Sequence, residues 1–308
     1  MDESPDRRPH FDGTFSAYQR YNSIMNTKKI KAMLRLFRPE LPLAAGICVV
    51  TGQFLAAGRF PPLGVGILGF LSVFALSSTA LILNDYFDYE VDLVNHPDRP
   101  LPSGAVSKGE VIGLSIATTL VGLVTAAMLG LDVLLVSIPI WLIGVLYNWR
   151  FKKTGLPGNL MVCASVAATF IFGAVTVNDP WNGNVWAFSL MAFFIDLGEE
   201  IAGDAMDMEG DRKINSQSIA LRKGKRLALR VTVVMWSIAI LVSLVPVILG
   251  WMGTFYLVSV LFIAIVLITS SVRLLRSQTP EAGRRAMRIA YLGATLAILA
   301  FIIGQLLG

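Results

Sequence analysis

Residues 62–92 have the sequence PLGVGILGFLSVFALSSTALILNDYFDYEVD, a long apolar run that ends in a cluster of acidic residues. A second run of this kind, residues 184–211, ends in EEIAGDAMDMEGD. No Lys or Arg lies between Arg59 and Arg99, or between Lys153 and Arg212. Closely spaced carboxylates repel one another unless a cation joins them, and Mg²⁺ favours oxygen ligands shared with substrate phosphates. The two stretches therefore predict a membrane-embedded site that holds a diphosphate through Mg²⁺.

The composition indicates a membrane protein, because the chain is 55% hydrophobic and only 15% charged. Nine apolar segments have the length of about 17–25 residues that a bilayer core requires. Their apolar residues are continuous rather than alternating, which favours helices over a closed β-barrel, the other backbone that lipid allows. We therefore expect an all-α membrane protein with nine transmembrane helices. The segments lie near residues 41–58, 62–84, 110–130, 131–148, 157–178, 184–203, 226–249, 251–272 and 286–307.

The basic residues predict the orientation of the chain. With the N-terminus in the cytoplasm, all of the 26 basic residues except Arg59 fall in the N-terminal stretch or in cytoplasmic loops, which is the positive-inside pattern. This sorting explains the pI of about 9.3 without a nucleic-acid partner. We expect a multi-pass protein of the cell membrane whose two acidic clusters face the cytoplasm. Residues 1–24 are expected to form a mobile polar tail, and residues 25–38 an interfacial helix.

On a helix, each acidic cluster would place its oxygen ligands on one face. The spacing is i, i+4, i+8 for Asn84, Asp88 and Asp92, and i, i+4, i+7, i+11 for Glu200, Asp204, Asp207 and Asp211. The alternative is a solvated acidic face, but such faces usually carry Lys or Arg three or four residues away, and these do not. Metal binding is therefore the favoured interpretation of the pair of clusters.

Two further groups of residues leave alternatives open. Arg99, Lys152 and Lys153 share a side with the acidic stripes and could bind a diphosphate, or could only orient the helices. The stretch from Asp196 to Glu200 lies inside or at the edge of a span, where unpaired charge is costly and usually marks function. A cation transporter places ionisable groups near the membrane midplane, whereas most carboxylates here lie at helix ends. A transporter is therefore the less favoured class.

Four stretches resemble the UbiA superfamily of intramembrane prenyltransferases. Residues 84–92 (NDYFDYEVD) with 96–104 (HPDRPLPSG) are similar to its first signature motif, and residues 204–212 (DAMDMEGDR) to its second. Tyr147 with residues 152–159 (KKTGLPGN) is similar to the loop after its fourth helix, and Arg38-Pro39 to its N-terminal Arg-Pro. The chain departs from the family pattern at Leu41, where Asn is frequent, at Gly203, where Lys is common, and at residues 215–220.

This resemblance implies a fold, a cofactor and a set of site residues. Nine helices would surround a central cavity, and residues 25–308 would form the prenyltransferase domain. Mg²⁺ would hold an isoprenyl diphosphate. Tyr147 lies one turn from the basic loop, where its ring could stabilise the allylic cation or could belong to the aromatic belt at the membrane interface. The implied metal ligands are Asn84, Asp88, Asp92, Asp204, Asp207 and Asp211, with Asp88, Asp92, Asp207, Asp211 and Tyr147 as catalytic residues. The implied diphosphate-binding residues are Arg99, Lys152 and Lys153. Arg38 and Arg212, which are basic and expected on the same side, are candidates for binding an anionic phosphate on the acceptor.

The lipophilic acceptor is the less constrained partner. The run from Asn84 to Gly104 is most similar to archaeal members that join geranylgeranyl groups to glycerol phosphate ethers, so geranylgeranylglyceryl phosphate is the expected acceptor. An aromatic acceptor of quinone synthesis, of the menaquinone type, is the alternative. A CDP-alcohol phosphotransferase, another class of Mg²⁺-dependent membrane enzyme, is disfavoured because its Asp-Gly-x-x-Ala-Arg signature is missing.

Overall fold

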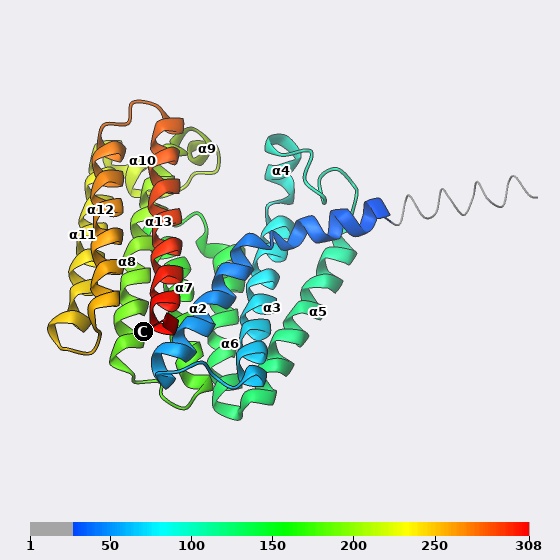
Figure 1. The fold of residues 1–308 in the computed structure, drawn as a ribbon. Coiled ribbons are helices and arrows are strands. Elements are labelled where there is room, and N and C mark those ends of the chain that lie inside the picture. Colours follow the sequence, from blue (N-terminus) through cyan, green and yellow to red (C-terminus); the bar gives the residue numbers. More distant parts are fainter. Residues whose placement is uncertain (1–26, 308) are drawn as a thin grey trace, which may run out of the picture.

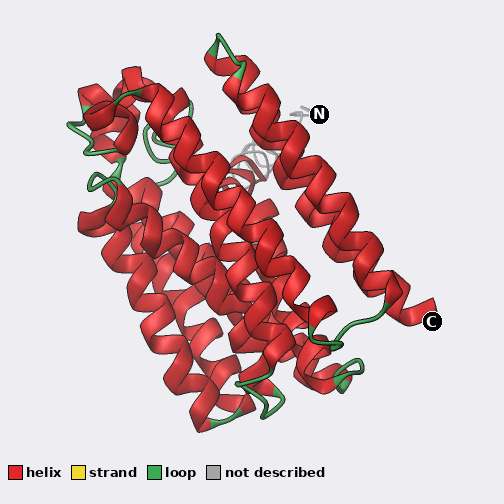
Figure 2. Ribbon diagram, turned by 90° about the vertical axis from the view of Figure 1, so that its left-hand side faces the viewer, coloured by secondary structure: helices red, strands yellow, loops and turns green. Residues whose placement is uncertain are grey.

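The computed structural model describes residues 27–307, which form helices and connecting loops without strands (Figures 1 and 2). Nine long helices coincide with the nine predicted segments, and α13 differs most because it begins at Pro280 rather than near residue 286. The prediction of an all-α membrane protein is confirmed. The long helices are α2 (Glu40–Ala57), α3 (Leu63–Phe87), α5 (Lys108–Leu129), α6 (Leu131–Leu146), α7 (Leu156–Thr176), α8 (Gly183–Met206), α11 (Lys225–Ile248), α12 (Thr254–Leu275) and α13 (Pro280–Leu307).

Within the described residues, eight of these helices are long and apolar enough to cross a membrane. The helix that does not meet this description is α8, which carries Asp196, Glu199, Glu200 and Asp204. It packs against α7 and α11 among the other long helices, as Figure 1 also shows. The number of spans, nine, stays a prediction.

Short helices gather at one end of the bundle, which we call the motif end because it carries both acidic motifs (Figure 1). They are α4 (Tyr89–Asn95), α9 (Met208–Lys213) and α10 (Ile219–Lys223). Residues 27–37 are also helical, in agreement with the helix expected over 25–38, and their Ala32 and Leu36 pack in one hydrophobic cluster with Ile82 of α3. The predicted tail, residues 1–24, lies outside the described residues.

Glycines let α2 and α7 approach closely at the centre of the bundle. A Cβ atom on Gly52 would lie 2.1 Å from the carbonyl oxygen of Phe170, and one on Gly173 would lie 2.2 Å from that of Val49. Close backbone contact through small residues is a common way for helices to associate in lipid, where no hydrophobic force drives helices together. Only glycine fits at these two positions, so the contact fixes the close approach of α2 to α7.

A central cavity of about 450 Å³ lies among the long helices. We call it the chamber. Its walls come from α2, α3, α6, α7, α8, α12 and α13, and most of the lining side chains are apolar. Asn84 and Tyr147 are among the lining residues, so the chamber reaches the motif end. The central cavity implied by the resemblance is therefore present.

Candidate active site

The first acidic motif lies where α3 gives way to α4. The α3 helix ends at Phe87, and Asp88 adopts a turn conformation (φ −85°, ψ 0°) before α4 begins. The Asp88 N–H still donates to the Asn84 carbonyl at 2.9 Å, and the Asp92 N–H donates to the Asp88 carbonyl at 2.8 Å. The expected helix is therefore interrupted at Asp88, but the spacing of four residues along its face is kept.

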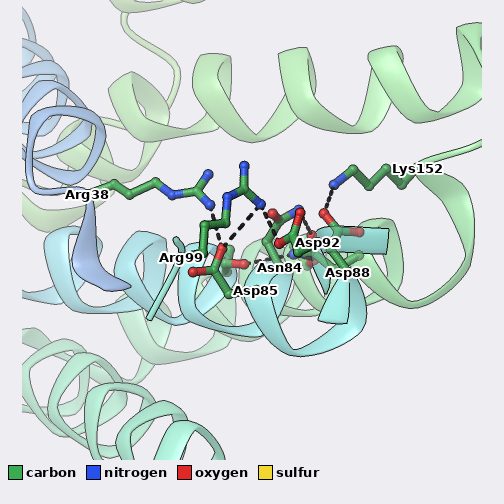
Figure 3. Close-up of polar contacts among 10 residues, drawn as sticks. Arg38, Asn84, Asp85, Asp88, Asp92, Arg99 and Lys152 are labelled. Atoms are coloured by element: carbon green, nitrogen blue, oxygen red, sulfur yellow. Dashed lines mark hydrogen bonds and ion pairs between the residues drawn. The ribbon is translucent and has the colours of Figure 1, made fainter. Parts of the chain in front are cut away.

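Basic side chains from distant segments surround this motif (Figure 3). Arg38 forms an ion pair with Asp85, and Lys152 forms one with Asp88. Arg99 donates to Asp92 at 2.5 Å and lies 3.9 Å from Asp85. The expectation that the acidic clusters lack positive partners is therefore wrong in three dimensions. It holds only along the chain, because helix packing brings Arg38 and Lys152 to the motif from 47 and 64 residues away.

The second acidic motif repeats this backbone arrangement. The α8 helix ends at Met206, Asp207 adopts a turn (φ −106°, ψ 13°), and α9 follows. The Asp207 N–H donates to the Gly203 carbonyl at 2.9 Å, and the Asp211 N–H donates to the Asp207 carbonyl at 3.0 Å. Asp207 and Asp211 therefore take the positions that Asp88 and Asp92 hold in the first motif.

The side chains of the second motif have fewer basic partners than those of the first. The Asn159 amide of α7 donates to Asp204 at 2.9 Å. Arg284 of α13 forms an ion pair with Asp207. The Oδ2 atom of Asp211 is buried without a hydrogen-bond partner among the described residues. Burial, followed by the charge of Asp207, raises the pKa of Asp211 above its usual value.

Two loops at the motif end hold the motifs in place. The Gln217 N–H donates to the Lys153 carbonyl at 2.9 Å, which joins the loop after α6 to the loop after α9. Gly155 has a φ of +70°, and a Cβ atom there would lie 2.3 Å from the Gln217 carbonyl oxygen, so this contact between the loops needs glycine.

Tyr147 begins a π-helical turn, Tyr147–Phe151, and lies within electrostatic reach of both Asp88 and Asp204. π-Helical turns of this kind are frequent at functional sites.

Not every predicted site residue joins these contacts. Lys153 and Arg212 are exposed, and within residues 27–307 neither makes a side-chain ion pair. The sequence interpretation did not assign Arg284, whose contact with Asp207 spans 77 residues and has no local signal. It also left out Asn148, which contacts Asn84 at 2.9 Å, and gave no role to Asp85, although that residue is 1% exposed.

The donor atoms of the two motifs suit Mg²⁺, because they are carboxylate and amide oxygens. The partnerless buried Oδ2 of Asp211 is the kind of atom that a cation would satisfy. In the described part of the chain, no three His, Cys, Asp or Glu side chains converge closely enough to hold a metal ion. The first-motif carboxylates are instead held by basic side chains, as Figure 3 shows. The metal ligand sets therefore stay predictions.

Proteins related to this chain in sequence align with most of its length. A digeranylgeranylglyceryl phosphate synthase of Thermococcus kodakarensis is 33% identical over 278 residues, which are 90% of this chain and 99% of the relative. A protein of the same name from Methanopyrus kandleri is 36% identical over 275 residues, or 89% of this chain and 98% of the relative. The similarity therefore extends over about nine tenths of this chain and nearly all of each relative, rather than over an isolated motif.

Solved structures share the fold. One from a study of digeranylgeranylglyceryl phosphate synthase in membranes has a TM-score of 0.76 at 28% identity, and the match covers 90% of this chain and 98% of that one. A UbiA homologue from Archaeoglobus fulgidus, bound to GPP and Mg²⁺, has a TM-score of 0.67 at 21% identity, with 88% and 99% covered. The model of the UbiA prenyltransferase family matches residues 45–302. The chain belongs to the UbiA prenyltransferase family.

Proposed function

We propose that this enzyme transfers a geranylgeranyl group from geranylgeranyl diphosphate to geranylgeranylglyceryl phosphate, in a Mg²⁺-dependent step of ether-lipid synthesis. The observation that carries the proposal is the meeting of two acidic motifs and three basic side chains at the motif end of an apolar chamber. Relatives named digeranylgeranylglyceryl phosphate synthase support the acceptor. The A. fulgidus homologue bound to GPP and Mg²⁺ supports the prenyl donor and the cofactor.

The reaction requires that the charge of the leaving diphosphate be neutralised at the motif end and that water be excluded from the chamber. The allylic C–O bond breaks, and the diphosphate leaves with the electron pair. Arg38, Arg99 and Lys152 stabilise the charge that develops on the diphosphate, after exchanging their present carboxylate partners for phosphate oxygens. Mg²⁺, held by residues of both motifs, supplies further neutralisation of that charge when bound. The apolar lining of the chamber keeps water from the allylic cation, and Tyr147 presents its ring there.

The charged lining of the chamber favours an alcohol over an aromatic acid as acceptor. Its charged residues are Asp196, Glu199 and Glu200, and no Lys, Arg or His lines it among the described residues. An acceptor such as 4-hydroxybenzoate carries a carboxylate on its reacting ring, and no basic side chain among the described lining residues could pair with it. A glycerol ether offers a neutral hydroxyl to the chamber, while Arg38 or Arg212 at the motif end can bind its phosphate.

The orientation is part of the proposal: the motif end faces the cytoplasm, where both substrates' anionic groups are found. Single cysteines at two exposed positions test it, Ser103→Cys at the motif end and Arg59→Cys at the opposite end, with Cys48 and Cys163 replaced by Ala. A membrane-impermeant maleimide added to intact cells should label the Arg59 variant and spare the Ser103 variant until the cells are opened. The reverse labelling pattern contradicts the orientation.

A competition assay tests the reaction itself. Purified protein receives geranylgeranyl diphosphate and Mg²⁺ with geranylgeranylglyceryl phosphate, 1,4-dihydroxy-2-naphthoate and 4-hydroxybenzoate together, and mass spectrometry identifies the products. We expect the diether phosphate in the wild type, and loss of product in Asp88→Ala and Asp211→Ala. The matched controls are Glu90→Ala and Glu209→Ala, since both side chains are exposed. Prenylated aromatic products without any diether overturn the acceptor, and full turnover by both Asp variants overturns the metal assignment.

A further inference from the structure

Three carboxylates line the chamber although the rest of its wall is apolar or uncharged. Asp196, Glu199 and Glu200 follow the spacing i, i+3, i+4 on α8, so they share one face of that helix. They make no ion pair among the described residues. The Oδ2 atom of Asp196 is buried without a hydrogen-bond partner, and its neighbour is the Cys163 thiol. Unpaired carboxylates at membrane depth are costly and usually functional.

A purely structural role does not explain these three residues. A packing role would be filled better by apolar side chains, as at the buried neighbours Ile195, Leu197 and Ile201. A role in orienting α8 would need partners, and within residues 27–307 no salt bridge reaches this face. What remains is a ligand that enters the chamber and brings hydrogen-bond donors to the carboxylates.

Glu200 occupies a different place from the other two. It lies one helical turn before Asp204, or about 6 Å along the helix axis. Its electrostatic neighbours include Asp204 and Lys152, and Tyr147 lies within its reach. Asp196 lies one turn farther from Asp204, and the electrostatic neighbours of Glu199 include Asp196 and Tyr291 of α13. Glu200 is therefore the chamber carboxylate nearest to the groups that hold the diphosphate.

We propose that Glu200 accepts the proton of the acceptor's hydroxyl group as the ether bond forms. This inference rests on the proposed function, because it needs an alcohol as acceptor. The bond between C1 of the prenyl group and the diphosphate oxygen breaks, and its electron pair leaves with the diphosphate. A lone pair of the hydroxyl oxygen forms the new C1–O bond. The O–H bond breaks, and its proton moves to a carboxylate oxygen of Glu200.

The charged and titratable groups around Glu200 are compatible with this role. Asp196, Glu199 and Asp204 contribute negative charge, and Lys152 contributes positive charge from the motif end.

The test compares Glu200→Gln with the matched variant Glu209→Gln, whose side chain is exposed on α9, outside the chamber. Two quantities are measured for each: kcat for diether formation, and the Kd of geranylgeranyl diphosphate in the presence of Mg²⁺. We expect Glu200→Gln to lower kcat about 10²- to 10⁴-fold, the usual contribution of a general base, with Kd unchanged. Glu209→Gln is expected to keep kcat close to that of the wild type, because its side chain is exposed.

Glu200→Asp keeps the carboxylate and moves it by the length of one methylene group, so this variant should retain more activity than Glu200→Gln. It also provides a second variant with which to test the role of Glu200 if Glu200→Gln fails to fold. The inference is overturned if Glu200→Gln retains a kcat close to that of the wild type. It is also overturned if Kd rises in parallel with the fall in kcat, which would place Glu200 among the diphosphate-binding groups. A wild type that forms no diether would instead refute the proposed function, so the two failures are distinguishable.

Discussion

Replacing Asp85 with Asn should destabilise the motif end, because Asp85 holds two arginines together. Its side chain is 2% exposed, while Arg38 and Arg99 retain 29% and 26% exposure. Removing one partner of a buried ion pair costs about 3–5 kcal/mol. Both guanidinium groups keep contact with solvent, and Arg99 keeps its bond to Asp92. We therefore expect a smaller loss, about 2–3 kcal/mol in the free energy of unfolding.

The assay is thermal unfolding of the purified protein in detergent. At about 2–4 °C per kcal/mol for a chain of this size, Asp85→Asn should lower the Tm by about 4–12 °C. The control is Arg35→Gln, which removes an exposed pair with Asp98 whose atoms lie 3.7 Å apart. Exposed pairs of this kind contribute about 0–1 kcal/mol, so the Tm of this variant should stay near that of the wild type.

Asp85→Asn should also lower the KM for the prenyl diphosphate, because it removes a carboxylate that the diphosphate would have to displace from Arg38 and Arg99. An equal Tm for Asp85→Asn and Arg35→Gln would refute the energetic argument. A lowered Tm with an unchanged KM would keep Asp85 as a stabilising residue and remove Arg38 and Arg99 from substrate binding.

Three further predictions follow from the contacts. Lys152→Gln should raise the KM for the prenyl diphosphate by about tenfold or more, as expected for loss of a charge-assisted hydrogen bond. Lys153→Gln should change this KM little, because that side chain is exposed. Equal KM values for the two variants in steady-state kinetics would contradict the assignment of Lys152, rather than Lys153, to the diphosphate. Gly173→Ala should lower the Tm, since its Cβ would meet the Val49 carbonyl oxygen, whereas Gly113→Ala, which has open space, should leave the Tm unchanged or raise it. The raised pKa of Asp211 means that this carboxylate takes up a proton at a higher pH than an exposed Asp, and because metal ligands must be deprotonated, Mg²⁺ affinity should fall already in mildly acidic buffer. A Mg²⁺ titration of transfer activity at several pH values checks this prediction. A Mg²⁺ affinity that stays constant down to the pH range where an ordinary Asp titrates would contradict it.

The sequence alone was enough to predict the helices and the two motifs, because both depend on residues that are close along the chain. Hydrophobic length sets where a helix can cross lipid, and the run from Leu63 to Phe87 needs no other part of the chain to be recognised. Capping is equally local: Ser107 and Glu110 form a capping box at the start of α5. The spacing of Asp88 and Asp92, or of Asp207 and Asp211, survived the turn that interrupts each helix, because the backbone bonds across that turn keep the same separation.

Tertiary structure decided which charges meet. The sequence shows both acidic clusters without nearby bases, yet Arg38, Lys152 and Arg284 reach them across 47, 64 and 77 residues. Nothing in the local pattern specifies these partners, since each depends on how two or more helices pack. The chamber is decided in the same way, because Glu200 faces it only after α8 has packed against the helices around it. Helix formation is governed by local hydrogen bonds and hydrophobicity, whereas contacts between distant side chains depend on the packed geometry of the whole bundle.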